Sequence, residues 1–302
     1  MMEATAFSSE LEFRILGPLE LLAEARPLEL PAGKVLSLLG LLLLRANELV
    51  PAERLLEELW EGTPPRTAAT ALQGYVSQLR KLLEPEPSEP RLLLTRAPGY
   101  LLSLAPEQLD RSRFERLAEA GEQALRADEP QQAASLLAEA LSLWRGPALG
   151  DFRYERWAQA EAARLEELRL AALERRFEAE LALGRHASLV SELEPLVAEY
   201  PLRERLRAQL MLALYRSGRQ AEALEHYQQA RAALVEQLGI EPAGELQALE
   251  RSILRQEEGL EATLPQAAQR AALPAAAYRW SDAGRSSPHC SSCCAASAAL
   301  SP

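Results

Sequence analysis

Residues 67–83, TAATALQGYVSQLRKLL, decide the fold of this 302-residue chain. The large apolar positions of the stretch are spaced four, three and four residues apart: Leu72, Val76, Leu79 and Leu83. At 100° per residue these positions form one narrow stripe along a helix, and polar side chains occupy the opposite face. The pattern predicts a helix that packs on a core through its stripe and leaves its polar face open.

Short strands and two further helices are expected around this helix. Glycine and proline divide the first hundred residues into segments with different hydrophobic periods. These segments are a small sheet within 11–30, helices over 34–46 and 52–60, the helix over 67–83 with Thr67 as N-cap, and a hairpin over 91–104. Sheet, three helices and hairpin, in that order, are the parts of a winged helix-turn-helix, which we expect to span residues 10–105.

The polar face of the 67–83 helix carries side chains of the types that bind nucleic acid. Amides and hydroxyls pair with base edges or phosphates, and arginine or lysine binds phosphate or guanine. Gly74 has no side chain, which would let a groove wall approach closely. We expect the DNA-binding residues to be Arg66, Thr70, Gln73, Gly74, Ser77, Arg80, Lys81 and Arg96. The alternative is a polar face that is merely solvated.

Charge is distributed unevenly along the chain. The 33 basic and 44 acidic residues give a net charge of −11, which would disfavour nucleic acid if it were spread evenly. However, residues 62–83 and 90–106 hold five basic residues and no acidic one. Residues 1–105 total −4, and residues 106–260 total −8. Positive charge is therefore concentrated on one helix and one hairpin, while most of the acidity lies further along the chain.

From Pro106 to residue 260 the sequence predicts helix after helix, including one long helix over 155–183. Gly184 and Gly218 are 34 residues apart, which is the tetratricopeptide period, and packing positions follow at fixed offsets from each copy's start. A third copy starts at Asp128 without a glycine. The packing positions are Ala133, Leu137 and Ala140; Leu189, Leu193 and Leu196; and Ala223, Tyr227 and Ala230. The alternative is a generic antiparallel array of helices.

No catalytic motif or cofactor-binding motif is found. The chain contains no phosphate-binding loop, no G-x-G-x-x-G, no G-x-S-x-G and no H-E-x-x-H. The cysteines Cys290, Cys293 and Cys294 include one C-x-x-C, but no second pair completes a tetrahedral metal site. We therefore expect neither an enzyme nor a bound metal or cofactor.

No targeting or membrane segment is predicted. The longest apolar run, residues 35–44, has ten residues, and a membrane-spanning helix needs about 20. The N-terminus lacks the charged and apolar regions of a signal peptide. A cytoplasmic location without membrane contact is the expectation.

Residues 261–302 are rich in alanine, serine, cysteine and proline, a composition that predicts a disordered tail. A shifted reading frame is the alternative interpretation. Codons ending in G or C for residues 279–295, read in a shifted frame, give VVGRGAELAALLELLR, which looks like the start of a nucleotide-binding ATPase domain.

Residues 11 to about 260 resemble the antibiotic-regulatory-protein (SARP) family of transcription regulators. The matching strings are FRILGPLEL (13–21), ELWEGTPPRTAATALQGYVSQLRKLL (58–83), LLLTRAPGYLL (92–102), LSLWRGPALGDF (141–152) and PLRERLRAQLMLALYRSGRQAEALEHYQQAR (201–231). The resemblance implies a mainly α protein: an OmpR-type winged helix, then a bacterial transcriptional activation domain of tetratricopeptide-like helices over residues 106–260.

The same resemblance implies a function. The helix from Thr67 would enter the major groove of direct repeats in double-stranded DNA, and the hairpin with Arg96 would meet a minor groove or its phosphates. The helical domain would support homodimerisation on DNA and activation through RNA polymerase holoenzyme. The alternative is a helical-repeat scaffold for protein interactions, in which the winged helix reads no DNA.

Overall fold

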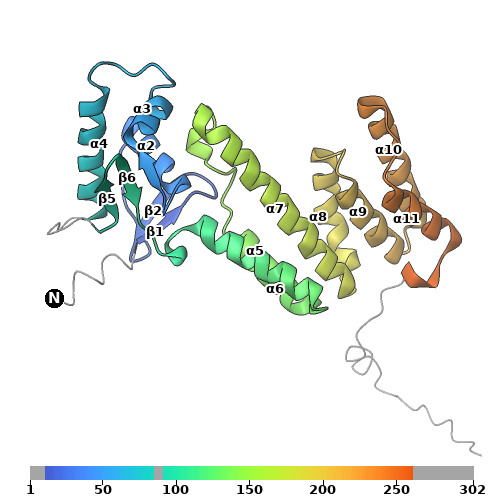
Figure 1. The fold of residues 1–302 in the computed structure, drawn as a ribbon. Coiled ribbons are helices and arrows are strands. Elements are labelled where there is room, and N and C mark those ends of the chain that lie inside the picture. Colours follow the sequence, from blue (N-terminus) through green and yellow to red (C-terminus); the bar gives the residue numbers. More distant parts are fainter. Residues whose placement is uncertain (1–10, 85–90, 261–302) are drawn as a thin grey trace, which may run out of the picture. The chain divides into compact units, whose positions relative to one another are not determined.

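The computed structural model describes residues 11–84 and 91–260 (Figure 1). The expected tail at 261–302, with its three cysteines and its alternative reading frame, lies outside the described residues. The described part contains two short antiparallel sheets and a series of helices. This confirms the expected fold class, a small sheet-containing N-terminal half followed by a helical half.

The N-terminal half has the predicted order of elements. A three-stranded sheet, β1-β2-β3, comes first, and a second sheet, β4-β6-β5, contains the hairpin. The elements are β1 (Leu11–Arg14), β2 (Glu20–Ala23), β3 (Arg26–Pro27), α2 (Lys34–Leu44), β4 (Leu49–Pro51), α3 (Ala52–Leu59), α4 (Ala68–Leu83), β5 (Leu93–Arg96) and β6 (Gly99–Leu102). Each helix begins and ends within two residues of its predicted bounds. Thr67 occupies the N-cap of α4, although its side chain makes no capping hydrogen bond.

Strand β4 was not predicted from the sequence. Its three residues pair antiparallel with β6, so that Val50 lies opposite Tyr100 and Pro51 opposite Gly99. A Cβ at Gly99 would lie 1.8 Å from the Val50 carbonyl oxygen, so only glycine allows this approach. The third strand thereby holds the hairpin on one side. The sequence does not predict this strand because three residues are too few to show an alternating pattern.

Helix α2 occupies the centre of the N-terminal half. Nearly all its side chains are buried, in agreement with an apolar sequence that shows no polar face. The stripe of α4 packs against the same core, and its four large apolar residues are all at most 2% exposed. The polar face of α4 consequently points away from α2.

The C-terminal half is helical, and its elements follow one another as hairpins. They are η1 (Pro106–Gln108), α5 (Asp110–Arg126), α6 (Pro130–Ser142), η2 (Gly150–Phe152), α7 (Arg156–Ala182), α8 (His186–Glu199), α9 (Glu204–Arg216), α10 (Gln220–Leu238), α11 (Gly244–Arg255) and η3 (Glu258–Leu260). Gly184 and Gly218 adopt positive φ angles of 76° and 78° at equivalent turns, before α8 and α10. Asp128 takes φ 58° at the matching turn before α6, where the third copy has no glycine.

The packing positions of the three repeat copies lie between helices as the 34-residue period predicts. Eight of the nine are buried, and Leu196 is half-buried. Small side chains at these offsets let paired helices approach closely. Each helical hairpin therefore buries its stripe against the next.

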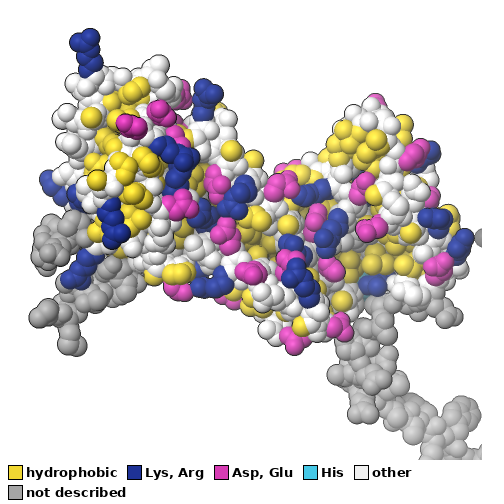
Figure 2. Space-filling view, in the orientation of Figure 1, with side chains coloured by type: hydrophobic (Ala, Val, Ile, Leu, Met, Phe, Trp, Pro, Cys, Tyr) yellow, Lys and Arg dark blue, Asp and Glu magenta, His cyan; other side chains and the backbone are white. Residues whose placement is uncertain are grey.

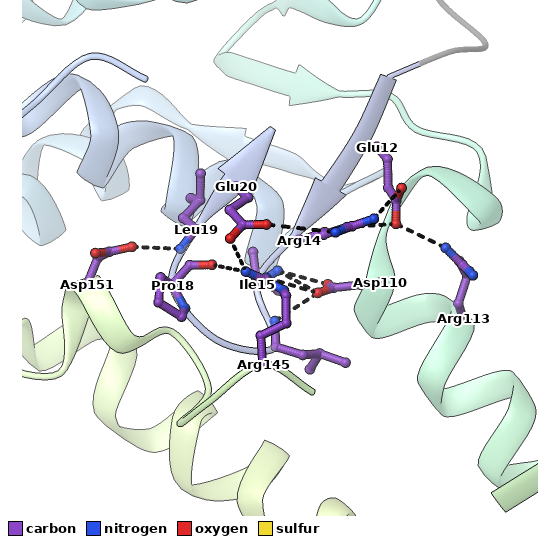
Figure 3. A network of polar contacts seen from close by, with 11 residues as sticks. Glu12, Arg14, Ile15, Pro18, Leu19, Glu20, Asp110, Arg113, Arg145 and Asp151 are labelled. Atoms are coloured by element: carbon purple, nitrogen blue, oxygen red, sulfur yellow. Dashed lines mark hydrogen bonds and ion pairs between the residues drawn. The ribbon is translucent and has the colours of Figure 1, made fainter. Parts of the chain in front are cut away.

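A buried carboxylate joins the two halves. Asp110, the first residue of α5, accepts hydrogen bonds from the backbone N–H groups of Ile15 and Leu16, each at 2.9 Å (Figure 3). Arg145 Nη2 lies 3.6 Å from the same carboxylate. Burial raises the pKa of Asp110, and the two N–H groups and the guanidinium oppose that rise. The loop after β1 is thus fixed to the start of the helical half.

Apolar packing reinforces the same junction. Leu16 belongs to the core formed by α5, α6 and α7, whereas Leu149, Phe152 and Ala158 belong to the core of the N-terminal half. Asp151 accepts a 2.6 Å hydrogen bond from the N–H of Leu19. Side chains therefore cross the expected 105/106 boundary in both directions.

Asp110→Asn should destabilise the protein by about 2–3 kcal/mol, because the amide NH₂ would face a backbone N–H donor and only one oxygen would remain to accept from Ile15 and Leu16. Urea denaturation measures the change. Glu107→Gln is the control, since Glu107 forms an exposed ion pair with Arg116 and its loss should change stability little. Equal stability of the two variants would show that the Asp110 contacts do not hold the junction.

Candidate nucleic-acid interface

The polar face of α4 is exposed along its whole length. Seven of the eight predicted DNA-binding residues are exposed, and Arg80 is half-buried. The structure places six of the eight on α4, Arg66 just before it, and Arg96 at the end of β5. The exposed members are Arg66, Thr70, Gln73, Gly74, Ser77, Lys81 and Arg96. Their contact with DNA stays a prediction.

Arg80 has a role that the sequence did not reveal. Its Nε donates a 2.9 Å hydrogen bond to the carbonyl of Leu93, and its Nη2 donates a 2.6 Å bond to Oγ1 of Thr95. Both acceptors lie on β5, so one guanidinium fastens α4 to the hairpin. Its first effect is to fix the orientation of the hairpin relative to α4, and any DNA contact would come in addition.

Further contacts hold α4 at its C-terminal end and at its middle. At the C-terminal end, Glu84 accepts hydrogen bonds from the backbone N–H groups of Arg91, at 2.6 Å, and of Leu92. In the middle of the helix, the ring of Tyr75 stacks on Trp60 with centroids 6.2 Å apart. The polar face of α4 is therefore presented by a helix fastened to both α3 and the hairpin.

Most cations of the described residues are neutralised within the chain. Arginines of the helical half form ion pairs with neighbouring glutamates, for example Arg164 with Glu161 at 2.8 Å and Arg231 with Glu241 at 2.6 Å. Within 11–84 and 91–260, six cations have neither an ion pair nor a side-chain hydrogen bond: Arg26, Arg66, Lys81, Arg96, Arg153 and Arg156. Three of these six belong to the predicted DNA-binding set.

The surface shows the same distribution of charge. Along the α4 edge, at the left of Figure 2, Lys and Arg side chains stand out without an Asp or Glu of the described residues beside them. Over the helical half, the two kinds of charge alternate. Free positive charge next to amides and hydroxyls is the surface that binds a phosphate backbone and reads bases.

Metal and membrane sites were also sought. In the described part of the chain, no group of three His, Cys, Asp or Glu residues is arranged to hold a metal ion. No helix among the described residues is long and apolar enough to cross a bilayer. The C-x-x-C of the tail lies outside the described residues.

Two protein-family models match the chain. The bacterial transcriptional activator domain matches residues 109–254, and the model described as transcriptional regulatory protein, C terminal, matches residues 26–102. Together they cover both halves of the described structure, with α4 and the hairpin inside the second match. Both descriptions name regulators of transcription.

Individual proteins match over the same region. The regulatory protein DnrI of Streptomyces peucetius is 41% identical over 262 residues, which cover 85% of this chain and 96% of DnrI. The regulatory protein AfsR of Streptomyces coelicolor is 41% identical over 254 residues, which cover 84% of this chain and 25% of AfsR. This chain therefore corresponds to nearly all of DnrI and to a quarter of AfsR.

A solved structure agrees with the fold. Mycobacterium tuberculosis EmbR, in complex with a low-affinity phosphopeptide, superposes with a TM-score of 0.79 at 38% sequence identity. The match covers 82% of this chain and 65% of the EmbR chain.

Neighbouring residues on α4 should respond differently to truncation. Arg80→Ala should lower stability by about 1–2 kcal/mol, because the carbonyl of Leu93 and the hydroxyl of Thr95 lose a charged donor. Lys81→Ala should change stability by less than about 0.5 kcal/mol, since Lys81 is exposed and has no partner among the described residues. Thermal and urea denaturation compare them. Similar losses for both variants would contradict the role assigned to Arg80.

Proposed function

The chain belongs to the SARP family of transcriptional regulators, and from this membership we propose that it is an activator that binds direct repeats in double-stranded DNA and helps recruit RNA polymerase holoenzyme. The observation that carries the proposal is the concentration of unneutralised cations on α4 and the hairpin. No cofactor and no catalytic step are part of it.

Helix α4 is proposed to read bases in the major groove, which is wide enough to admit an α-helix. Gln73 lies in the middle of its exposed face, and a glutamine side chain can pair with both N6 and N7 of adenine. Thr70 and Ser77 lie one turn away on either side and offer hydroxyls to bases or phosphates. Sequence preference would come from these three side chains.

The free cations are proposed to bind phosphates. Arg66 precedes α4, Lys81 lies in its last turn, and Arg96 ends β5, the strand that Arg80 fastens to α4. Such contacts set affinity and register but carry little sequence information. They also make binding depend on salt, because each bound phosphate releases counterions.

The helical half is proposed to act away from the DNA. Its net charge of −8 disfavours approach to phosphates. Direct repeats would place two copies in the same orientation along the duplex, and we propose that the protein binds them as a homodimer. The helical halves would then be available to each other and to the polymerase.

Selection from a random duplex pool should enrich direct repeats. Gln73→Ala should change which bases are enriched, because it removes a base-reading amide. Arg96→Ala should instead lower affinity about evenly across sequences and reduce the slope of log affinity against log salt by about 1. Fluorescence anisotropy over a salt series measures both effects.

Arg126→Ala is the matched control, since Arg126 is an exposed arginine of the helical half that pairs with Glu122. It should leave both readouts unchanged. Absence of any enriched sequence at moderate salt would overturn the activator proposal and favour a scaffold whose winged helix reads no DNA.

Gly74→Ala should separate stability from DNA binding. A Cβ at this position meets no heavy atom within 4 Å, so the variant should gain about 0.5–1 kcal/mol from improved helix propensity. The added methyl group would still lie on the face that approaches the groove and should weaken DNA binding. Unchanged affinity in the anisotropy titration would show that α4 keeps its distance from the groove at this residue.

A further inference from the structure

Tyr154 is the most exposed large hydrophobic residue among those described, with 78% of its surface accessible. The guanidinium of Arg153 lies 4.6 Å from the centre of its ring. Arg153 and Arg156 are two of the six cations without an ion pair or side-chain hydrogen bond in the described part of the chain. We call these three residues the Tyr154 surface.

The segment that carries the Tyr154 surface is firmly held. The N–H of Leu149 donates to the carbonyl of Ile15 at 3.0 Å, and the N–H of Gly150 donates to that of Gly17 at 3.1 Å. With the bond from Leu19 to Asp151, three hydrogen bonds fix the segment to the loop between β1 and β2. The Tyr154 surface is therefore not on a loose loop.

Two aromatic rings, buried Phe152 and half-buried Trp157, anchor the same segment to α2. A Cβ at Gly40 would lie 2.8 Å from the ring of Phe152 and 2.9 Å from that of Trp157, so both rings lie directly on the α2 backbone. Residues 153–156 lie between these two rings in sequence, and their exposed side chains point outward. The exposed side chains of residues 153–156 are therefore carried by a backbone that is fixed at both ends, as a preformed binding surface requires.

The Tyr154 surface is separated from the proposed DNA-binding face. Helix α2 packs against α4 and also against α7, and Figure 1 shows it between the two. The polar face of α4 points away from α2, while the Tyr154 surface lies at the start of α7. DNA bound along α4 would leave Arg153, Tyr154 and Arg156 free for a second macromolecule.

We propose that the Tyr154 surface docks a surface of RNA polymerase holoenzyme that presents carboxylates next to apolar side chains. The inference rests on the proposed function and names the part of the chain that makes the contact. Tyrosine and arginine are the residue types that most often dominate binding energy at interfaces. The ring offers apolar area, and two unneutralised guanidiniums offer donors for carboxylates.

The acidic groups of the segment leave those donors available. The Asp151 carboxylate already accepts a hydrogen bond from the N–H of Leu19. Glu155 lies between the two arginines in sequence, is half-buried, and forms no ion pair among the described residues. The arginines of the other helices are mostly paired with glutamates, so this is the one place in the helical half where two free guanidiniums and an exposed ring occur together in the described chain.

The test uses the full chain bound to its selected repeat DNA and purified RNA polymerase holoenzyme. Tyr154→Ala and Arg153→Glu should each weaken binding of the polymerase by the DNA-bound protein about ten-fold and reduce transcription from a repeat-containing template. Affinity for the DNA alone should not change. Tyr154→Phe should behave like the wild type, because it keeps the ring, and Arg126→Ala is the matched arginine control.

Unchanged polymerase binding and transcription in both Tyr154→Ala and Arg153→Glu would overturn the inference. A loss of cooperative binding to two repeats in these variants would also overturn the inference, because it would show that the Tyr154 surface contacts a second copy of the chain. Circular dichroism melts show whether each variant folds. If Tyr154→Ala or Arg153→Glu does not fold, Arg153→Ala takes its place in the test. If the wild type neither binds repeats nor activates transcription, the proposed function itself fails, which is a distinct result.

Discussion

The two oxygens of one buried carboxylate determine how the parts of this molecule are arranged. Asp110 accepts hydrogen bonds from the N–H groups of Ile15 and Leu16, a contact that joins the loop after β1 to the start of α5. The interaction has little freedom, because buried backbone donors need an acceptor and a buried carboxylate needs donors. Leu16 packs in the core formed by α5, α6 and α7. This packing positions the first sheet, α2 and α4 relative to the helices that follow.

The distribution of paired and unpaired cations relates this scaffold to function. Arginines that stabilise the fold are occupied by glutamates or by carbonyl oxygens, and Arg80 is the clearest case because it fastens the hairpin to α4. Among the described residues, five of the six cations without an ion pair or side-chain hydrogen bond lie just before or on α4, on the hairpin, or beside Tyr154. Net charge describes neither place, since both belong to halves that are acidic in total.

Much of the fold could be predicted because the signals are local. The stripe of α4 shows at spacings of three and four residues, and the turns at Gly184 and Gly218 require a positive φ that glycine tolerates. Strand β4 could not be predicted, because three residues show no period and its pairing with β6 depends on contact with Gly99. The roles of Asp110 and Arg80 were missed for the same reason, since their partners are brought close only by the fold.

Helix α7 extends this argument to how the chain holds together. Its 27 residues span about 40 Å. It contributes Ala158 to the core of the N-terminal half, Leu165 to the core formed by α5, α6 and α7, and Phe177 to the core formed with α8, α9, α10 and α11. Opening any one of these cores would leave apolar side chains of the same helix in water. Family matches divide the sequence into two modules, but α7 and the 149–157 segment pack on both sides of that division. An exchange of modules between relatives at residue 105 would therefore have to carry the 149–157 segment and α7 along with the winged helix.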